Sequence, residues 1–247
     1  FETVAQTVPD RLAIISDSTR LTYAELNDQA DRLATGLAAH GVTRGDKVGL
    51  YLYNGPAYLL GFIAACKLGA VPYNVNYRYR ADELRYLFAN ADSAAILHGA
   101  EFTPIIQDVR SDVPTLKVTV AVPDGSGADI SGSVDYADLL ASTPAGPWER
   151  GEEDIILSYT GGTTGMPKGV MWAHNDLREI TLQAARKLIP TPRNAAQFDL
   201  TRMVLESGSK TTGEAVGVGG GHDTFTCQRM TGDSSSSSTS RTRSLSA

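Results

Sequence analysis

Segments of two periodicities alternate along the first half of the chain, and this alternation constrains the fold more than any other feature. Short apolar runs typical of buried strands are followed by longer stretches with apolar residues at helical spacing. The expected strands are 47–53, 71–75, 94–97 and 117–122, and the expected helices are 56–68, 82–90 and 102–110. Strands that alternate with helices in this way form a parallel sheet flanked by helices, so we predict an α/β fold.

Another strand and helix precede these segments. Residues 12–16 are typical of a short buried strand. Thr22 and Glu25 have the spacing of a capping box, in which each side chain binds the backbone amide of the other residue. Apolar residues then recur at helical spacing over 26–38, and Gly41 suits the left-handed turn that ends such a helix.

The helix expected over 56–68 is apolar on nearly all sides, which predicts that it is buried. Asn54 is a candidate cap for this helix, and Pro56 suits its first turn. Residues 123–150 are rich in glycine, serine, proline and aspartate, and we expect them to form a surface excursion. Residues 154–159 then form an apolar strand that leads directly into a loop of glycine and threonine.

This loop carries the residue types that bind phosphate groups. Glycines allow backbone amides to approach an anion closely, threonine hydroxyls add donors, and lysine adds a positive charge. Because the loop follows a parallel strand, we expect it at the edge of the sheet where α/β proteins bind ligands. The candidate nucleotide-binding residues are Thr160, Gly161, Gly162, Thr163, Thr164, Gly165, Met166, Pro167 and Lys168. The loop lacks the G-K-[ST] pattern of a Walker A motif, and the alternative is a flexible surface turn.

The last part of the chain differs in composition. Residues 207–247 contain 24 serine, threonine or glycine residues among 41, including a run of five serines at 234–238. Such a segment buries too little apolar surface to offset the entropy cost of ordering, so we predict a disordered C-terminal tail. The preceding segment, 183–206, has only a weak helical pattern.

The overall composition excludes several classes of protein. The net charge is −6 and the pI is about 5.2, which argues against a nucleic-acid partner. Two cysteines, Cys66 and Cys227, are too few for a disulfide framework and favour a reducing, cytoplasmic setting. No signal peptide or transmembrane segment is visible, and because the chain starts at Phe1, not Met, we expect a segment before it.

The string Tyr159–Val170, Y-T-G-G-T-T-G-M-P-K-G-V, resembles the signature loop of the acyl-adenylate-forming, or AMP-binding, superfamily. This superfamily includes acyl-CoA synthetases, firefly luciferase and the adenylation domains of peptide synthetases. The segments L-T-Y-A-E-L at 21–26 and A-C-K-L-G-A-V-P-Y-N-V-N-Y-R-Y at 65–79 are similar as well. The strings N-V-N-Y-R-Y and G-V-M-W are most similar to those of actinobacterial long-chain or steroid-side-chain acyl-CoA ligases. The resemblance implies that 1–182 is an incomplete N-terminal domain of a fatty-acyl-CoA synthetase.

The resemblance implies a reaction in two steps. A fatty or related carboxylic acid reacts with ATP to give acyl-AMP and pyrophosphate, and coenzyme A then displaces AMP to give a thioester. Residues Thr160–Lys168 would hold the β- and γ-phosphates, with Thr160 near Mg²⁺. His174, four residues after Val170, corresponds to a family position near the acyl pocket; the alternative is a histidine that caps or packs beside the loop.

The resemblance ends near residue 182, and several family motifs are not found after it. These are a Y-G-x-T-E motif whose glutamate helps to hold Mg²⁺, a ribose-binding aspartate, and a C-terminal domain with a catalytic lysine. We interpret Thr231-Gly232-Asp233 as a chance match to the ribose-binding motif. The abrupt change suggests a frameshift or truncation, so an inactive remnant that at most binds nucleotide phosphates remains an alternative. A third hypothesis is an unrelated α/β binding module.

Overall fold

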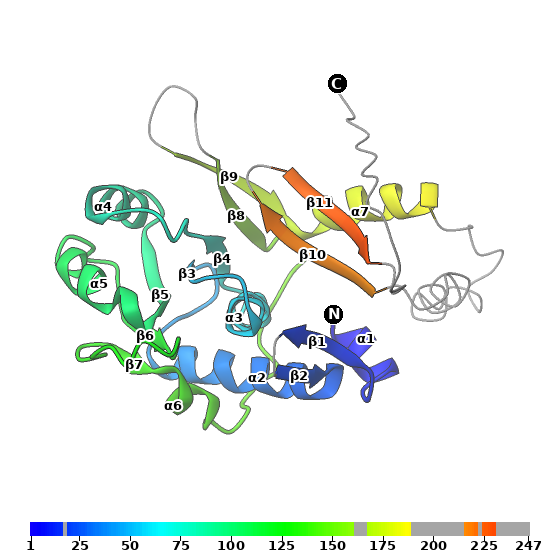
Figure 1. Cartoon of the computed structure of the whole chain (residues 1–247), viewed down its shortest axis with the longest axis horizontal. Helices are drawn as coiled ribbons and strands as arrows, with labels where there is room; N and C mark the ends of the chain where they lie inside the picture. The colour runs from blue at the N-terminus through cyan, green and yellow to red at the C-terminus, as the bar shows by residue number, and fades with distance from the viewer. Residues whose placement is uncertain (17–18, 161–166, 189–214, 222–223, 231–247) are drawn as a thin grey trace, which may run out of the picture. The chain divides into compact units, whose positions relative to one another are not determined.

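The computed structural model describes residues 1–16, 19–160, 167–188, 215–221 and 224–230. The chain divides into two compact units, 1–188 and 189–247, which we describe separately. The first unit is built on a seven-stranded sheet with the order β7-β6-β5-β3-β4-β8-β9 (Figure 1). These strands are β3 (Lys47–Tyr51), β4 (Val71–Asn74), β5 (Ser93–Gly99), β6 (Val118–Val122), β7 (Val134–Asp135), β8 (Ile155–Thr160) and β9 (Lys168–Ala173).

All neighbouring strands of this sheet are parallel except the last pair, β8 and β9. The central strand β3 aligns Val48 with Pro72 on β4 and with Ala95 on β5. The chain passes from β3 to β4 on one side and then crosses back to β5 on the other. The predicted α/β class with a mainly parallel sheet is therefore confirmed, and the crossover places helices on both faces.

One face of the sheet is covered by three helices, α2, α3 and α6, whose apolar residues form a single buried cluster with β3, β5 and β6. These helices are α2 (Tyr23–Ala39), α3 (Pro56–Lys67) and α6 (Tyr136–Leu140). Leu33 and Leu37 of α2 are fully buried in this cluster, as is Leu50 of β3. The α2–α6 contact is close, since a Cβ built on Gly36 would lie 2.7 Å from Cγ of Leu139.

The opposite face is covered by α4 (Ala81–Asn90) and α5 (Thr103–Arg110), with the short 3₁₀ helix η1 (Ala100–Phe102) before α5. In Figure 1 these helices lie together, away from α2 and α6. Leu84, Leu87 and Phe88 of α4 are fully buried against this face, as the helical spacing predicted. The strands β3, β5 and β6 are thus buried on both faces, which explains their nearly continuous apolar sequences.

The capping box expected before α2 is present. The backbone N–H of Thr22 donates to Oε2 of Glu25 at 2.8 Å, and Oγ1 of Thr22 accepts from the Glu25 N–H at 3.2 Å. Gly41 follows the helix with φ of +83°, so only glycine adopts this turn without strain. The cap contributes about 1 kcal/mol to the stability of the helix.

The expected start of α3 was partly wrong. Gly55 is the cap residue, without a side-chain hydrogen bond, and Asn54 does not cap the helix, whereas Pro56 occupies the first turn as predicted. The helix is also less buried than its composition suggested, because Leu59 is 46% exposed. A helix that is apolar on all sides must still present one side away from the sheet it covers.

The first strand is not the buried strand that its sequence predicted. β1 (Leu12–Ser16) pairs antiparallel with β2 (Thr19–Thr22) in a separate two-stranded sheet. Only Ile14 of β1 is buried, whereas Leu12 and Ile15 are 49% and 62% exposed. A two-stranded sheet has no second layer to bury both faces of each strand. The short helix α1 (Glu2–Thr7) precedes it.

The excursion expected over 123–150 is not wholly a surface segment, which corrects the prediction. It contributes β7 to the edge of the sheet and α6 to the core. Tyr136 and Leu139 of α6 are buried, and the side chain of Asp135 accepts a hydrogen bond from the Ala137 N–H at 2.9 Å. Because this segment is rich in glycine and serine, its sequence did not indicate the two-residue strand and the five-residue helix.

The last helix of the first unit is α7 (His174–Leu188), so helical structure extends past residue 182 into the segment of weak pattern. The second unit contains β10 (Ala215–Gly221) and β11 (Thr224–Met230), which pair antiparallel. The serine run at 234–238 and most of the other residues of 207–247 lie outside the described ranges, so the predicted disorder of this tail stays a prediction. Within the described ranges, none of the helices is long and apolar enough to span a bilayer.

Candidate nucleotide-binding site

The predicted phosphate loop connects two antiparallel strands. Thr160, the last residue of β8, lies opposite Lys168, the first residue of β9. Because β8 is parallel to β4, the loop leaves the carboxyl edge of the sheet, as expected. The structure describes Thr160, Pro167 and Lys168, whereas six of the predicted residues lie outside the described ranges: Gly161, Gly162, Thr163, Thr164, Gly165 and Met166.

The strand pairing brings the two chemically active groups at the ends of the loop together. Thr160 and Lys168 are both exposed. Opposite residues of an antiparallel pair point to the same face, with Cβ atoms about 5 Å apart. A hydroxyl donor and a lysine thus extend from neighbouring positions on one face of the hairpin, and these residue types suit an anion such as a nucleotide phosphate.

Tyr159 fixes the strand that enters the loop. Its hydroxyl donates to Oδ1 of Asn90, the last residue of α4, at 2.8 Å, and its ring meets the ring of Tyr73 edge-on at 5.8 Å between centroids. Partial burial, followed by the proximity of Tyr86 and Asp92, raises the pKa of Tyr159. The phenol therefore stays neutral and acts as the hydrogen-bond donor.

Tyr86 holds the other end of the loop. Its hydroxyl donates to the backbone carbonyl of Pro167 at 3.3 Å, and Pro167 is buried. Sequence reasoning missed Tyr86 and Asn90, because it assigned 82–90 only by its apolar positions. The available signal was their spacing of four, which places two hydrogen-bonding side chains on one side of the helix, beside its buried stripe.

Gly169 lets the ring of Tyr159 cross the hairpin. The two residues are opposite each other in the β8–β9 pair. A Cβ built on Gly169 would lie 3.2 Å from Cζ of Tyr159 and 3.0 Å from Cδ1 of Leu157. The glycine after the lysine therefore has a packing role in the structure.

His174 lies where β9 turns into α7. Its backbone N–H donates to the carbonyl of Asp154 at 2.8 Å, and its Nε2 lies 3.9 Å from Sγ of Cys66 on α3. Burial raises the pKa of Cys66 to about 12, so the sulfur stays a thiol. Asp154 in turn accepts a hydrogen bond from Nη2 of Arg44 at 2.7 Å. These contacts fit a histidine that packs beside the loop, and its role toward an acyl substrate stays a prediction.

Thr160 as a magnesium contact also stays a prediction. Among the residues that the structure describes, no group of three or more histidine, cysteine, aspartate or glutamate side chains could hold a metal ion. A single hydroxyl is a weak site alone. Magnesium in phosphate sites depends mainly on substrate oxygens and water, so Thr160 fits as one contact within such a set.

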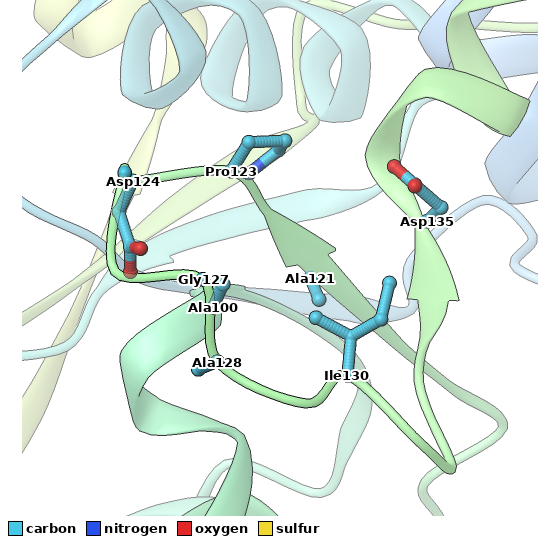
Figure 2. Close-up of a pocket in the computed structure, with 9 residues that line it drawn as sticks. Ala100, Ala121, Pro123, Asp124, Gly127, Ala128, Ile130 and Asp135 are labelled. Atoms are coloured by element: carbon cyan, nitrogen blue, oxygen red, sulfur yellow. The ribbon is translucent and has the colours of Figure 1, made fainter.

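A separate open cavity of about 410 Å³ lies at the carboxyl end of β6 (Figure 2). Its walls are mainly small apolar residues together with Asp124 and Asp135, and none of the predicted site residues contributes to it. Both carboxylates are engaged locally: Asp124 accepts from the N–H of Glu101 at 2.7 Å, and Asp135 caps α6. Burial opposes ionisation of Asp124, but the hydrogen bonds outweigh it and lower the pKa. The two charged side chains of the cavity are therefore both engaged carboxylates, which do not suit a nucleotide phosphate.

Comparison with known proteins identifies the family and the fold of the chain. A family model described as "AMP-binding enzyme" matches residues 1–200. The solved structure of the anthranilate CoA ligase AuaEII with anthranoyl-AMP is 25% identical, with a TM-score of 0.67, and the match covers 74% of this chain and 35% of that chain. A fatty acyl CoA synthetase from Mycobacterium tuberculosis is 27% identical, with a TM-score of 0.63, over 74% of this chain and 36% of that chain.

Curated relatives are similar in sequence as well. A medium/long-chain-fatty-acid–CoA/3-oxocholest-4-en-26-oate–CoA ligase from Mycobacterium marinum is 42% identical, over 70% of this chain and 33% of the relative. A 3-oxocholest-4-en-26-oate–CoA ligase from Rhodococcus rhodochrous is 44% identical, over 69% and 31%. The chain thus spans about a third of the length of these relatives. Because the family model covers most of the chain and the fold agrees, the chain belongs to the AMP-binding enzyme family.

Proposed function

We propose that this chain is the N-terminal part of a fatty-acyl-CoA ligase and supplies its phosphate-binding loop. The reaction is ATP-dependent adenylation of a fatty or steroid-side-chain carboxylic acid, followed by thioester formation with coenzyme A. The observation that carries the proposal is the β8–β9 hairpin, which presents Thr160 and Lys168 together at the carboxyl edge of the sheet. The names of the relatives, which are fatty-acid and 3-oxocholestenoate CoA ligases, support the substrate class.

In the first step the carboxylate attacks the α-phosphorus of ATP and pyrophosphate leaves; in the second the coenzyme A thiol displaces AMP. The ammonium of Lys168 stabilises negative charge on the β- and γ-phosphates, and the hydroxyl of Thr160 donates to their oxygens. The loop residues 161–166 supply further amide and hydroxyl donors. Mg²⁺ would be held chiefly by the phosphates, with Thr160 as a protein contact.

The proposal divides the chain into three segments. Residues 1–182 form part of the adenylate-forming domain, 183–206 form a divergent segment, and 207–247 form a tail low in sequence complexity. We infer a cytoplasmic setting without a nucleic-acid partner from the net charge of −6 and the small number of cysteines. His174 is retained as a candidate contact to the acyl substrate.

Carboxylate-dependent exchange of labelled pyrophosphate into ATP tests the proposal. Exchange above background supports adenylation by this chain, whereas its absence, with ATP binding retained, favours the inactive remnant. In either case we expect the double variant Lys168→Ala with Thr163→Ala to bind ATP at least roughly 100-fold more weakly, because hydrogen bonds to charged groups each contribute about 1.5–3 kcal/mol and the variant removes two such groups.

Lys47→Ala is the matched control, since Lys47 begins β3 at the opposite, amino end of the sheet. Its ATP affinity should equal that of the unmodified chain. Unchanged affinity in the double variant would show that the loop is not a phosphate site and would reject the proposal.

A further inference from the structure

One helix holds both strands at the base of the phosphate loop. Asn90 of α4 accepts from Tyr159 just before the loop, and Tyr86 of the same helix donates to Pro167 just after it. We infer that Tyr86 and Asn90 are positioning residues, which fix the separation of the loop's two ends and thereby its phosphate-binding geometry. We call these two hydrogen bonds the α4 clamp. The inference rests on the proposed function and adds residues that act on the loop from outside it.

The clamp joins distant parts of the chain. Tyr86 and Pro167 are 81 residues apart in sequence, and Asn90 and Tyr159 are 69 apart. Tyr86 and Asn90 are themselves one helical turn apart and so lie on the same side of α4. One bond engages the chain just before the loop, at Tyr159 of β8, and the other engages Pro167 directly before β9, so a change in either one shifts one end of the loop against the other.

The helix that carries the clamp is itself fixed to the rest of the domain. Leu87 and Phe88 of α4 are fully buried against the sheet. Nη2 of Arg85 donates to Asp108 of α5 at 2.8 Å, and Nε of Arg85 donates to Asp112 at 2.7 Å. One side of α4 is thus held by the core, another by α5, and a third contacts the hairpin. The clamp therefore ties the loop to a well-packed element of the domain.

The clamp acts on the two proposed phosphate contacts at the ends of the loop, Thr160 and Lys168. Thr160 follows Tyr159 directly, and Lys168 follows Pro167 directly. Each clamp bond therefore acts one residue away from a proposed phosphate contact. Charge stabilisation depends on donors held in place before the charge develops, so a small displacement of either residue weakens phosphate binding.

Hydrogen exchange tests the positioning itself. We expect Tyr86→Phe and Asn90→Leu each to speed amide exchange in the loop-proximal ends of β8 and β9 by roughly fivefold, the usual effect of one lost hydrogen bond. Tyr51→Phe is the control, because its hydroxyl also donates to a backbone carbonyl, that of Tyr79 at 2.9 Å, and Tyr79 is not part of the hairpin. No faster exchange in either clamp variant would overturn the inference.

ATP affinity tests the consequence. Both clamp variants should bind ATP several-fold more weakly without a matching fall in melting temperature, and Asn90→Asp should restore affinity because it keeps an oxygen acceptor for Tyr159. Asn90 is exposed, so the Asn90 variants should fold even if Tyr86→Phe does not. Unchanged ATP affinity in the clamp variants, while Lys168→Ala with Thr163→Ala weakens it, overturns the clamp alone. Unchanged affinity in all of them overturns the proposed function as well.

Discussion

At the scale of single residues, His98 shows how burial decides the chemistry of a side chain. It lies fully buried at the end of β5, with Nδ1 2.8 Å from the Gly99 carbonyl and Nε2 3.0 Å from Oγ of Ser133. The carbonyl can only accept, so Nδ1 carries the proton and Nε2 accepts from the serine. Burial lowers the pKa of His98, although the Gly99 carbonyl and the charge of Asp124 act in the opposite direction.

This predicts a stability that falls in mild acid. Below about pH 6.5 the unfolded chain binds a proton at His98 that the folded chain resists, so the free energy of unfolding decreases as the pH falls. Melting temperatures measured between about pH 7.5 and pH 5.5 should therefore drop, and His98→Gln should reduce this drop. His40→Gln, at an exposed position after α2, is the control and should keep it. An undiminished pH dependence in His98→Gln would contradict the prediction.

At the scale of elements, the ammonium of Lys67 connects three helices. It ends α3, and its Nζ lies 2.6 Å from Oδ1 of Asp31 on α2 and 3.0 Å from Oε1 of Glu2 on α1. The lysine side chain is 5% exposed, whereas the two carboxylates are 30% and 39% exposed. The cation is thus removed from water while its partners keep some hydration, so the cation depends most on the pairing.

Lys67→Met tests this connection, because methionine keeps the unbranched apolar stem. Loss of one partner of a buried pair costs about 3–5 kcal/mol, but here the carboxylates regain solvent, so we expect a loss of about 1–3 kcal/mol in the free energy of unfolding. Chemical denaturation measures it. Arg178→Met, which breaks the exposed pair with Glu179, should change stability by no more than about 0.5 kcal/mol. Equal effects of the two substitutions would refute the special role of Lys67.

At the scale of the whole molecule, the large sheet ends in a strand with exposed apolar side chains. β9 is the last strand in the sheet order, and Val170, Met171 and Trp172 are 40%, 70% and 38% exposed. An edge strand with exposed apolar residues can pair with a strand of another chain. The chain spans about a third of the length of its curated relatives. In this chain β9 is the last strand of the sheet, and its exposed apolar side chains are available for contact with another molecule.

We therefore expect self-association through β9, and Met171→Lys should weaken it. A lysine on an edge strand opposes pairing by charge repulsion and by its cost of desolvation. Sedimentation velocity at several concentrations measures the association. Leu59→Lys, on the exposed side of α3, is the control and should have a smaller effect. If both substitutions reduce association equally, general apolar exposure is responsible and edge pairing is not.

The local features of this protein could be predicted from its amino-acid sequence. The capping box of Thr22 and Glu25, the buried face of α4 and the α/β alternation all depend on residues close together in the chain, so spacing revealed them. The composition of the loop after β8 indicated phosphate binding in the same way. In 123–150 the many turn-forming residues predicted a surface segment, although this segment contains the strand β7 and the helix α6, which packs in the core.

The contacts between residues far apart in the chain follow from the folded arrangement of the elements and could not be predicted from the sequence. The pairing of Thr160 with Lys168, the α4 clamp and the contact of Cys66 with His174 each join separate elements. No periodicity encodes such contacts, because they depend on how the strands are ordered and on which face each helix covers. Local patterns fix backbone conformation, whereas packing of the complete sheet fixes the neighbours of the phosphate loop.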